Sequence, residues 1–216
     1  MKKEETIDQL IQCGVLAVLR APNKESALLM ANAILPSGVK GLEITYTIPK
    51  ASEVIQALRE DKRFASCLIG AGTVLDKETA KDAILHGAMF IVSPSFDDGV
   101  ANIAKQENIP YFAGCLTPTE IVTALRGGAD LIKIFPGNVV GPHYLKDIHG
   151  PLPEAKLLPS GGVSIENAGE WIKNGAVMVS AGGSLTAPAK DGNYPEITKR
   201  AKQFLEEVQK ARALLK

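Results

Sequence analysis

The chain has 216 residues, with 24 Lys and Arg against 24 Asp and Glu, and 45% of its residues are apolar. Zero net charge argues against a general nucleic-acid-binding protein, because such binding needs a basic surface that neutralises phosphates. No apolar run approaches the roughly 18 residues that a membrane helix needs. The N-terminal segment MKKEETIDQLIQ is typical of a short amphipathic helix and not of a signal peptide. The length suits one domain, 1–216, with a sizeable core.

The three cysteines, Cys13, Cys67 and Cys115, are odd in number and match no metal-binding spacing. We therefore expect reduced, mostly buried thiols in a cytoplasmic protein. The three histidines form neither an HxH nor an HExxH pattern, so no metal site is expected.

Short apolar segments alternate with amphipathic ones along the whole chain. The predicted strands are Val15–Arg20, Gly41–Thr45, Leu68–Thr73, Phe90–Ser93, Tyr111–Cys115, Leu131–Phe135, Lys156–Ser160 and Val177–Ala181. The predicted helices are Lys24–Leu35, Ser52–Glu60, Lys77–His86, Gly99–Gln106, Thr119–Arg126, Ile165–Asn174 and Tyr194–Leu215. Helix starts are marked by the N-cap residues Asn23, Asp76, Thr117 and Ser164, and helix ends by Gly38, Gly87, Gly128 and Gly175.

Eight βα units without a linker predict a parallel sheet with helices outside. In a chain of this length they fit a (β/α)8 TIM barrel with an N-terminal helix. A doubly wound open sheet is the alternative. Its dinucleotide-binding form carries a GxGxxG turn after the first strand, where this chain has Arg20-Ala21-Pro22-Asn23, so we favour the barrel.

Lys133 interrupts an apolar predicted strand. Because alternate side chains of a barrel strand face inward, Ile132 and Ile134 are expected to face the helices and Lys133 the interior. Burial disfavours the ammonium form, and a neutral amine attacks a ketone to form an iminium. An interior lysine held only by a structural ion pair is the alternative.

Glu43 and Arg20 are the other charged residues well embedded in predicted strands. Leu42 and Ile44 flank Glu43, so its carboxylate is expected to face inward, either as a general acid–base group or simply as an ion-pair partner. Arg20 ends the first strand, and its guanidinium suits a substrate carboxylate held by two hydrogen bonds. A salt bridge at the rim is the alternative for Arg20.

Glycine-rich turns follow three predicted strands. The sequence GAGT within Ile69–Val74 is a weak signal, because glycine also suits a crowded barrel interior. Strands seven and eight are followed by Ser160-Gly161-Gly162 and by Gly182-Gly183-Ser184. Barrel phosphate sites commonly occupy these two loops, so the pair predicts phosphate binding. Two tight turns without chemical consequence are the alternative.

Together these motifs resemble the class I KDPG (2-dehydro-3-deoxy-phosphogluconate) and 4-hydroxy-2-oxoglutarate aldolases. The resemblance extends from Val15 to about Ser184 and rests on the ordered set LEIT, IGAGTVL, VSP, KIFP, PSGGV and GGS. It implies a homotrimer of (β/α)8 barrels without a metal or an organic cofactor.

The resemblance also implies residue roles. Lys133 matches the Schiff-base lysine and Glu43 the acid–base glutamate of the family. The positions that match the pyruvate pocket are Thr73, Pro94 and Phe135, and those that match the phosphate-binding turns are Gly161, Gly162 and Ser184, with Ser160 where many members have threonine.

One position departs from the family pattern. Many members have an arginine four residues after the glutamate, where this chain has Thr47. Phosphogalactonate-type aldolases instead resemble this chain in having an arginine at the end of the first strand. We therefore expect Arg20 to hold the substrate carboxylate in place of a residue at Thr47.

The expected reaction is cleavage of 2-dehydro-3-deoxy-6-phosphogluconate to pyruvate and glyceraldehyde 3-phosphate. Cleavage of 4-hydroxy-2-oxoglutarate to pyruvate and glyoxylate is a further expectation. One alternative is the phosphogalactonate epimer as substrate. Two others are a sugar-phosphate isomerase or epimerase, in which Lys133 acts only as a cation, and a non-catalytic protein that binds a phosphorylated metabolite.

Overall fold

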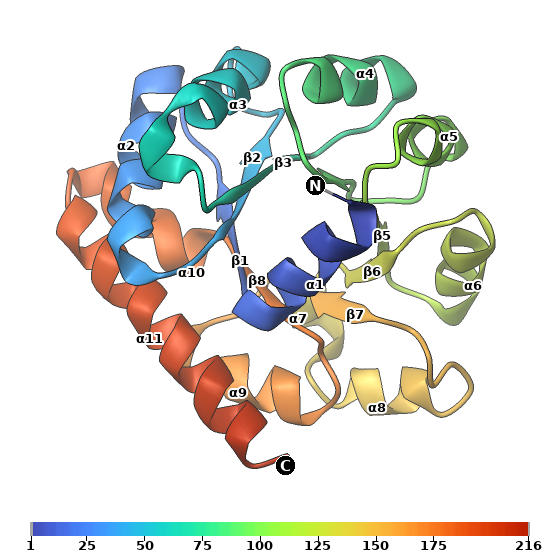
Figure 1. The fold of residues 1–216 in the computed structure, drawn as a ribbon. Coiled ribbons are helices and arrows are strands. Elements are labelled where there is room, and N and C mark those ends of the chain that lie inside the picture. The colour runs from blue at the N-terminus through green and yellow to red at the C-terminus, as the bar shows by residue number, and fades with distance from the viewer. Residues whose placement is uncertain (1, 216) are drawn as a thin grey trace.

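A parallel eight-stranded barrel surrounded by helices forms the fold in the computed structural model, which describes residues 2–215 (Figure 1). The strands pair in the order β7-β6-β5-β4-β3-β2-β1-β8. Parallel bridges from Leu157 to Ala176 and from Ser160 to Ser180 join the two ends of this order, which closes the barrel. The predicted (β/α)8 barrel is confirmed, and the open doubly wound sheet is wrong. The strands are β1 (Val15–Leu19), β2 (Gly41–Thr45), β3 (Leu68–Gly72), β4 (Ile91–Val92), β5 (Tyr111–Cys115), β6 (Leu131–Ile134), β7 (Leu157–Pro159) and β8 (Val179–Ala181).

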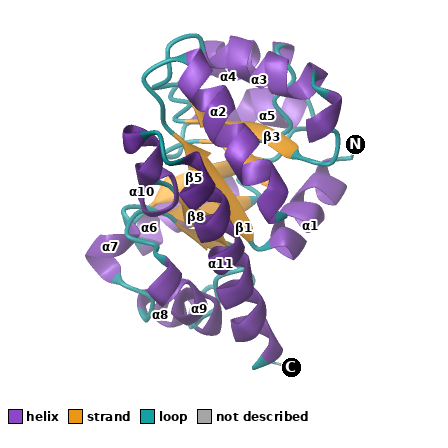
Figure 2. Ribbon diagram, turned by 90° about the vertical axis from the view of Figure 1, so that its left-hand side faces the viewer, coloured by secondary structure: helices purple, strands orange, loops and turns teal. Residues whose placement is uncertain are grey.

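Helices enclose the strands on all sides (Figure 2). The longer ones are α1 (Lys3–Cys13), α2 (Lys24–Ile34), α3 (Ala51–Glu60), α4 (Lys77–Leu85), α5 (Asp98–Gln106), α6 (Pro118–Arg126), α9 (Ile165–Lys173) and α11 (Tyr194–Ala213). The short ones are α7 (Gly137–Val140), α8 (Tyr144–His149), α10 (Gly183–Thr186) and the 3-10 turns η1 (Leu35–Ser37), η2 (Lys62–Phe64) and η3 (Ala187–Asp191). Among residues 2–215, no helix is both long and apolar enough to cross a bilayer.

The predicted helix boundaries follow from local chemistry. Asn23, Asp76 and Thr117 each accept a hydrogen bond from a backbone N–H in the first turn of the next helix, and Ser164 is the N-cap of α9. The four glycines expected at helix ends all have positive φ, between 93° and 106°. Such a left-handed residue ends a helix easily when it is glycine.

Two apolar cores result from strand alternation. Side chains on the outer face of the strands pack against the helices, and the inner face forms a smaller cluster inside the barrel. Phe90 and Phe112 stack within this inner cluster, with ring centroids 5.5 Å apart. The inner cluster comprises Ile7, Leu10, Leu16, Leu68, Phe90, Val92, Phe112, Leu131, Leu158 and Met178.

Four residues predicted at the ends of strands lie just beyond them. Arg20 directly follows the last residue of β1, Thr73 that of β3, Phe135 that of β6 and Ser160 that of β7. Thr73 has a φ of 57°, which is incompatible with continued strand and is uncommon for a β-branched residue. These residues therefore lie at the carboxyl end of the barrel, the end that carries active sites in this fold.

Helix α1 seals the opposite end. Figures 1 and 2 show α1 lying across the barrel, with α7 and α10 at the other end. Ile7 and Leu10 of α1 belong to the inner cluster. Arg212 of α11 fixes this helix, because its guanidinium donates to the carbonyls of Ile11 (2.5 Å), Gln12 (2.9 Å) and Val177 (2.7 Å).

Replacing Arg212 by Ala should destabilise the fold by about 2 kcal/mol, because three backbone carbonyls would lose a charged donor. Urea denaturation of both proteins measures this difference. Lys210→Ala on the same helix is the control, since Lys210 is exposed and pairs only with Glu207, so its loss should cost less than about 0.5 kcal/mol. Equal unfolding midpoints for the two variants would contradict the role of Arg212.

Candidate active site

Lys133 and Glu43 face each other inside the barrel. Lys133 is 3% exposed and Glu43 is fully buried, and 3.9 Å separates the Lys133 Nζ from the Glu43 Oε1. Ile132 and Ile134 lie in the outer core, as strand alternation predicts. The two charges are compensated as an ion pair, but their separation exceeds hydrogen-bond length. Neither carboxylate oxygen of Glu43 has a hydrogen-bond partner among the described residues, so both can accept a hydrogen bond from a bound molecule.

Neighbouring glycines make room for this pair. A Cβ built on Gly72 would lie 2.1 Å from Oε1 of Glu43, so no side chain fits at that position of β3. On the other side, Gly114 pairs with Lys133 between β5 and β6, and a Cβ there would meet the Pro94 carbonyl at 2.1 Å. Gly72 thus leaves room for the Glu43 side chain, and Gly114 leaves room for the Pro94 backbone beside Lys133.

Thr73, Pro94 and Phe135 surround the pair through these contacts. Thr73 follows Gly72, Pro94 packs on Gly114, and the Phe135 ring centroid is 5.2 Å from the Lys133 ammonium. An aromatic face at this distance stabilises a cation. The three positions of the expected pyruvate pocket therefore lie near Lys133 or Glu43.

A cavity of about 310 Å³ adjoins Phe135 and is lined by both glycine turns. Gly161 and Gly162 have φ of 84° and 73°, and a Cβ on Gly162 would lie 2.5 Å from that of Asn138. Only glycine suits these two consecutive left-handed positions. The lining comprises Val18, Arg20, Phe135, Ser160, Gly161, Gly162, Val163, Ser164, Ser180, Gly182, Gly183 and Ser184.

The two turns are tied together. The Ser184 hydroxyl donates to the Val163 carbonyl at 2.6 Å, and Arg200 donates to the Ser184 carbonyl at 2.9 Å from behind. The hydroxyl proton of Ser184 is therefore committed to the protein. What remains for an anion here is the backbone of the turns and nearby cationic side chains.

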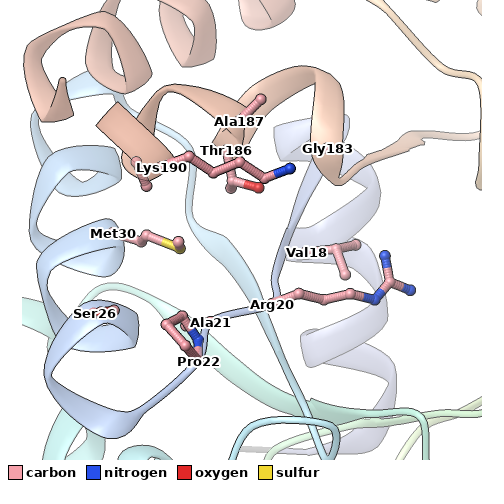
Figure 3. Close-up of a pocket in the computed structure, with 11 residues that line it drawn as sticks. Val18, Arg20, Ala21, Pro22, Ser26, Met30, Gly183, Thr186, Ala187 and Lys190 are labelled. Atoms are coloured by element: carbon pink, nitrogen blue, oxygen red, sulfur yellow. The ribbon is translucent and has the colours of Figure 1, made fainter. Parts of the chain in front are cut away.

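Arg20 supplies positive charge to this cavity. Its Nη1 lies 3.5 Å from a Cβ built on Gly182, which places the guanidinium beside the glycine turn after β8. Figure 3 shows the side chain running past Val18, away from Pro22 and Met30. Arg20 also borders a second cavity of about 570 Å³, between β1, α2 and the α10–η3 segment, over which the Lys190 side chain extends.

Thr47 is engaged within the protein. Thr45 donates its hydroxyl proton to the Leu19 carbonyl at 2.9 Å, and the Thr45 and Thr47 hydroxyl oxygens are 2.8 Å apart. Because Thr45 has one hydroxyl proton, Thr47 is the donor between them. Thr47 lines neither of the two cavities bordered by Arg20, unlike Arg20 itself.

Ser180 is a lining residue that the sequence analysis did not identify. It is 2% exposed and its hydroxyl has no partner among the described residues. Strand alternation was the available signal, because it places Ser180 on the same inward face as Met178. Ser180 is also the only residue of β8 that carries a hydroxyl.

Two of the three cysteines, Cys67 and Cys115, are buried thiols that do not offer a competing nucleophile. Cys115 ends β5, and burial raises the pKa of its thiol to about 12. Burial also raises the pKa of Cys67. Both thiols therefore remain protonated near neutral pH, and all three cysteines are free.

Comparisons with known proteins identify the family of the chain. The family model "KDPG and KHG aldolase" matches residues 6–200. The chain is 31% identical to 2-dehydro-3-deoxy-phosphogluconate aldolase of Treponema pallidum, over 92% of this chain and 95% of that protein. It is 34% identical to 2-dehydro-3-deoxy-6-phosphogalactonate aldolase of Escherichia coli, over 79% and 83%.

A solved structure is similar over most of its length. The KDPG aldolase of Legionella pneumophila, with pyruvate captured as a covalent carbinolamine, superimposes with a TM-score of 0.80 at 28% identity. The match covers 88% of this chain and 92% of that one. By its sequence and its fold, the chain belongs to the KDPG and KHG aldolase family.

Proposed function

We propose that this protein is a Schiff-base aldolase that cleaves 2-dehydro-3-deoxy-6-phosphogluconate to pyruvate and glyceraldehyde 3-phosphate. The observation that carries the proposal is the buried Lys133 beside a buried Glu43 with free carboxylate oxygens. 4-Hydroxy-2-oxoglutarate, which yields pyruvate and glyoxylate, is a second substrate of the same chemistry. The phosphogalactonate epimer is the alternative substrate, supported by the Escherichia coli relative and by Arg20.

The reaction starts when the Lys133 ammonium gives a proton to a water molecule in the site and the resulting amine attacks the C2 ketone. The carbinolamine hydroxyl takes a proton back and leaves as water, which gives an iminium that accepts the electron pair of the breaking C3–C4 bond. Glu43 takes the proton of the C4 hydroxyl, the aldehyde leaves, and an enamine of pyruvate remains. Glu43 returns the proton to C3, and water then hydrolyses the iminium to pyruvate and free Lys133.

The remaining site residues bind the substrate in this proposal. Thr73, Pro94 and Phe135 enclose the pyruvate portion. The turns Ser160–Gly162 and Gly183–Ser184 hold the phosphate with backbone N–H groups. The position of Arg20 beside Gly182 supports a contact to the phosphate, in place of the carboxylate contact expected from the sequence.

We also propose, from the family resemblance, that the enzyme is a cytoplasmic homotrimer. Light scattering that gives three times the chain mass of 22.9 kDa would support it. An isomerase or epimerase on the same barrel would use Glu43 as a base without forming an imine, and a binding protein would not turn over either substrate.

Pyruvate and borohydride should modify Lys133 irreversibly. Reduction of the imine adds the mass of pyruvate less one oxygen atom, and peptide mapping by mass spectrometry identifies the modified lysine. Lys133→Met should abolish both the adduct and turnover, whereas Lys146→Met, at an exposed position on α8, should preserve both. An unmodified wild-type protein, or an adduct on another lysine, would refute the Schiff-base mechanism.

Glu43→Gln should separate imine formation from proton transfer. The amide keeps the shape of the side chain but is not a base, so turnover should fall by roughly 10²- to 10⁴-fold. The borohydride adduct on Lys133 should still form. Turnover within threefold of wild type would show that another group moves the proton.

Arg20→Ala should weaken catalysis only for substrates that carry phosphate. Loss of one charge-assisted contact should raise KM for phosphogluconate substrate by roughly 10- to 100-fold. Exchange of the pyruvate methyl protons with deuterium, followed by NMR, needs no phosphate and should continue at the wild-type rate. Slower exchange in Arg20→Ala but not in the surface control Arg126→Ala would assign Arg20 to the carboxylate instead.

A further inference from the structure

The hydroxyl of Ser180 is a buried polar group without a partner in the described protein. Ser180 lines the cavity beside the glycine turns, and it is 2% exposed. Buried hydroxyls are normally hydrogen-bonded, and an unpaired one is retained at a cost. Because Ser180 lies in the wall of a cavity, a molecule bound in that cavity can supply the missing hydrogen bond.

Ser180 faces the barrel interior. Met178, two residues earlier on the same face, belongs to the inner cluster, whereas Val179 and Ala181 belong to the outer one. Ser180 forms a β-bridge with Ser160, the first residue of the glycine turn after β7. Phe135 also lines this cavity and lies next to the Lys133 ammonium. Ser180 thus lines the cavity that extends from Phe135 to the glycine turns.

The proposed function leaves one of the two hydroxyl groups of the substrate without a role. The C4 hydroxyl gives a proton to Glu43 in that proposal, with the pyruvate portion beside Lys133 and the C6 phosphate at the glycine turns. The C5 hydroxyl, between the reacting carbon and the phosphate, has no assigned partner. In the aldehyde product this group is the C2 hydroxyl of glyceraldehyde 3-phosphate.

We propose that Ser180 is a specificity-determining residue that hydrogen-bonds this hydroxyl. The inference rests on the proposed aldolase function and deepens it. A serine hydroxyl both donates and accepts, so it satisfies a substrate hydroxyl fully. A fixed partner on one wall of the cavity also selects the configuration at this carbon. Sites that bind a substrate hydroxyl discriminate strongly against the analogue that lacks it.

The test is the aldol addition of pyruvate to two phosphorylated aldehydes. One is D-glyceraldehyde 3-phosphate and the other is 3-phosphooxypropanal, which lacks the C2 hydroxyl. Ser180→Ala should lower kcat/KM for the first by roughly 10- to 100-fold and for the second by less than about twofold. The preference for D- over L-glyceraldehyde 3-phosphate should fall in parallel.

Ser180→Cys separates hydrogen bonding from volume, because a thiol is similar in size but a weak donor. Ser180→Cys should show the same changes in kcat/KM as Ser180→Ala. It replaces Ser180→Ala in the test if urea denaturation shows that Ser180→Ala does not fold. Equal losses for both aldehydes, or no loss for either, would overturn the role of Ser180. A wild-type protein that adds pyruvate to neither aldehyde would instead refute the proposed function, so the two failures are distinguishable.

Discussion

The ion pair between Lys133 and Glu43 is the constraint on which the half of the barrel at the carboxyl ends of the strands depends. A charge inside a barrel is costly unless an opposite charge compensates it. The two side chains come from β6 and β2, on different sides of the barrel, so the pair requires closure of the sheet. It also requires space, which explains why Gly72 lies beside Glu43, where a side chain would clash with the carboxylate.

The opposite half of the barrel, which α1 covers, makes this arrangement stable. Below the pair the interior is filled by an apolar cluster, and α1 covers its end with Ile7 and Leu10. The clamp from Arg212 holds α1 in place. The pair therefore lies between this apolar cluster and the carboxyl end of the barrel, the end that carries active sites in this fold.

Local rules were sufficient to predict most of the fold. Helix caps, glycine stops and strand alternation each depend on a few neighbouring residues, and these rules led to the barrel, to Lys133 and to Glu43. Strand ends were less accurate, because Thr73 adopts a left-handed conformation that no propensity favours. Contacts between distant segments were not predictable: Arg212 bonds a carbonyl 200 residues away, and the bond between Thr45 and the end of β1 spans 26 residues.

Contacts between distant segments also connect Thr47 with Arg20. Thr47 donates to Thr45, and Thr45 donates to the Leu19 carbonyl, immediately before Arg20. These two hydroxyl bonds join the end of β2 to the end of β1. The Thr45 hydroxyl fixes the Leu19 carbonyl next to Arg20, and the Arg20 guanidinium lies beside the glycine turn after β8. The chain thus has a threonine after β2, where many members of the family that it resembles have an arginine, and an arginine directly after β1, and the two positions are connected through Thr45 and Leu19. The cation at this end of the barrel therefore lies beside the glycine turn after β8.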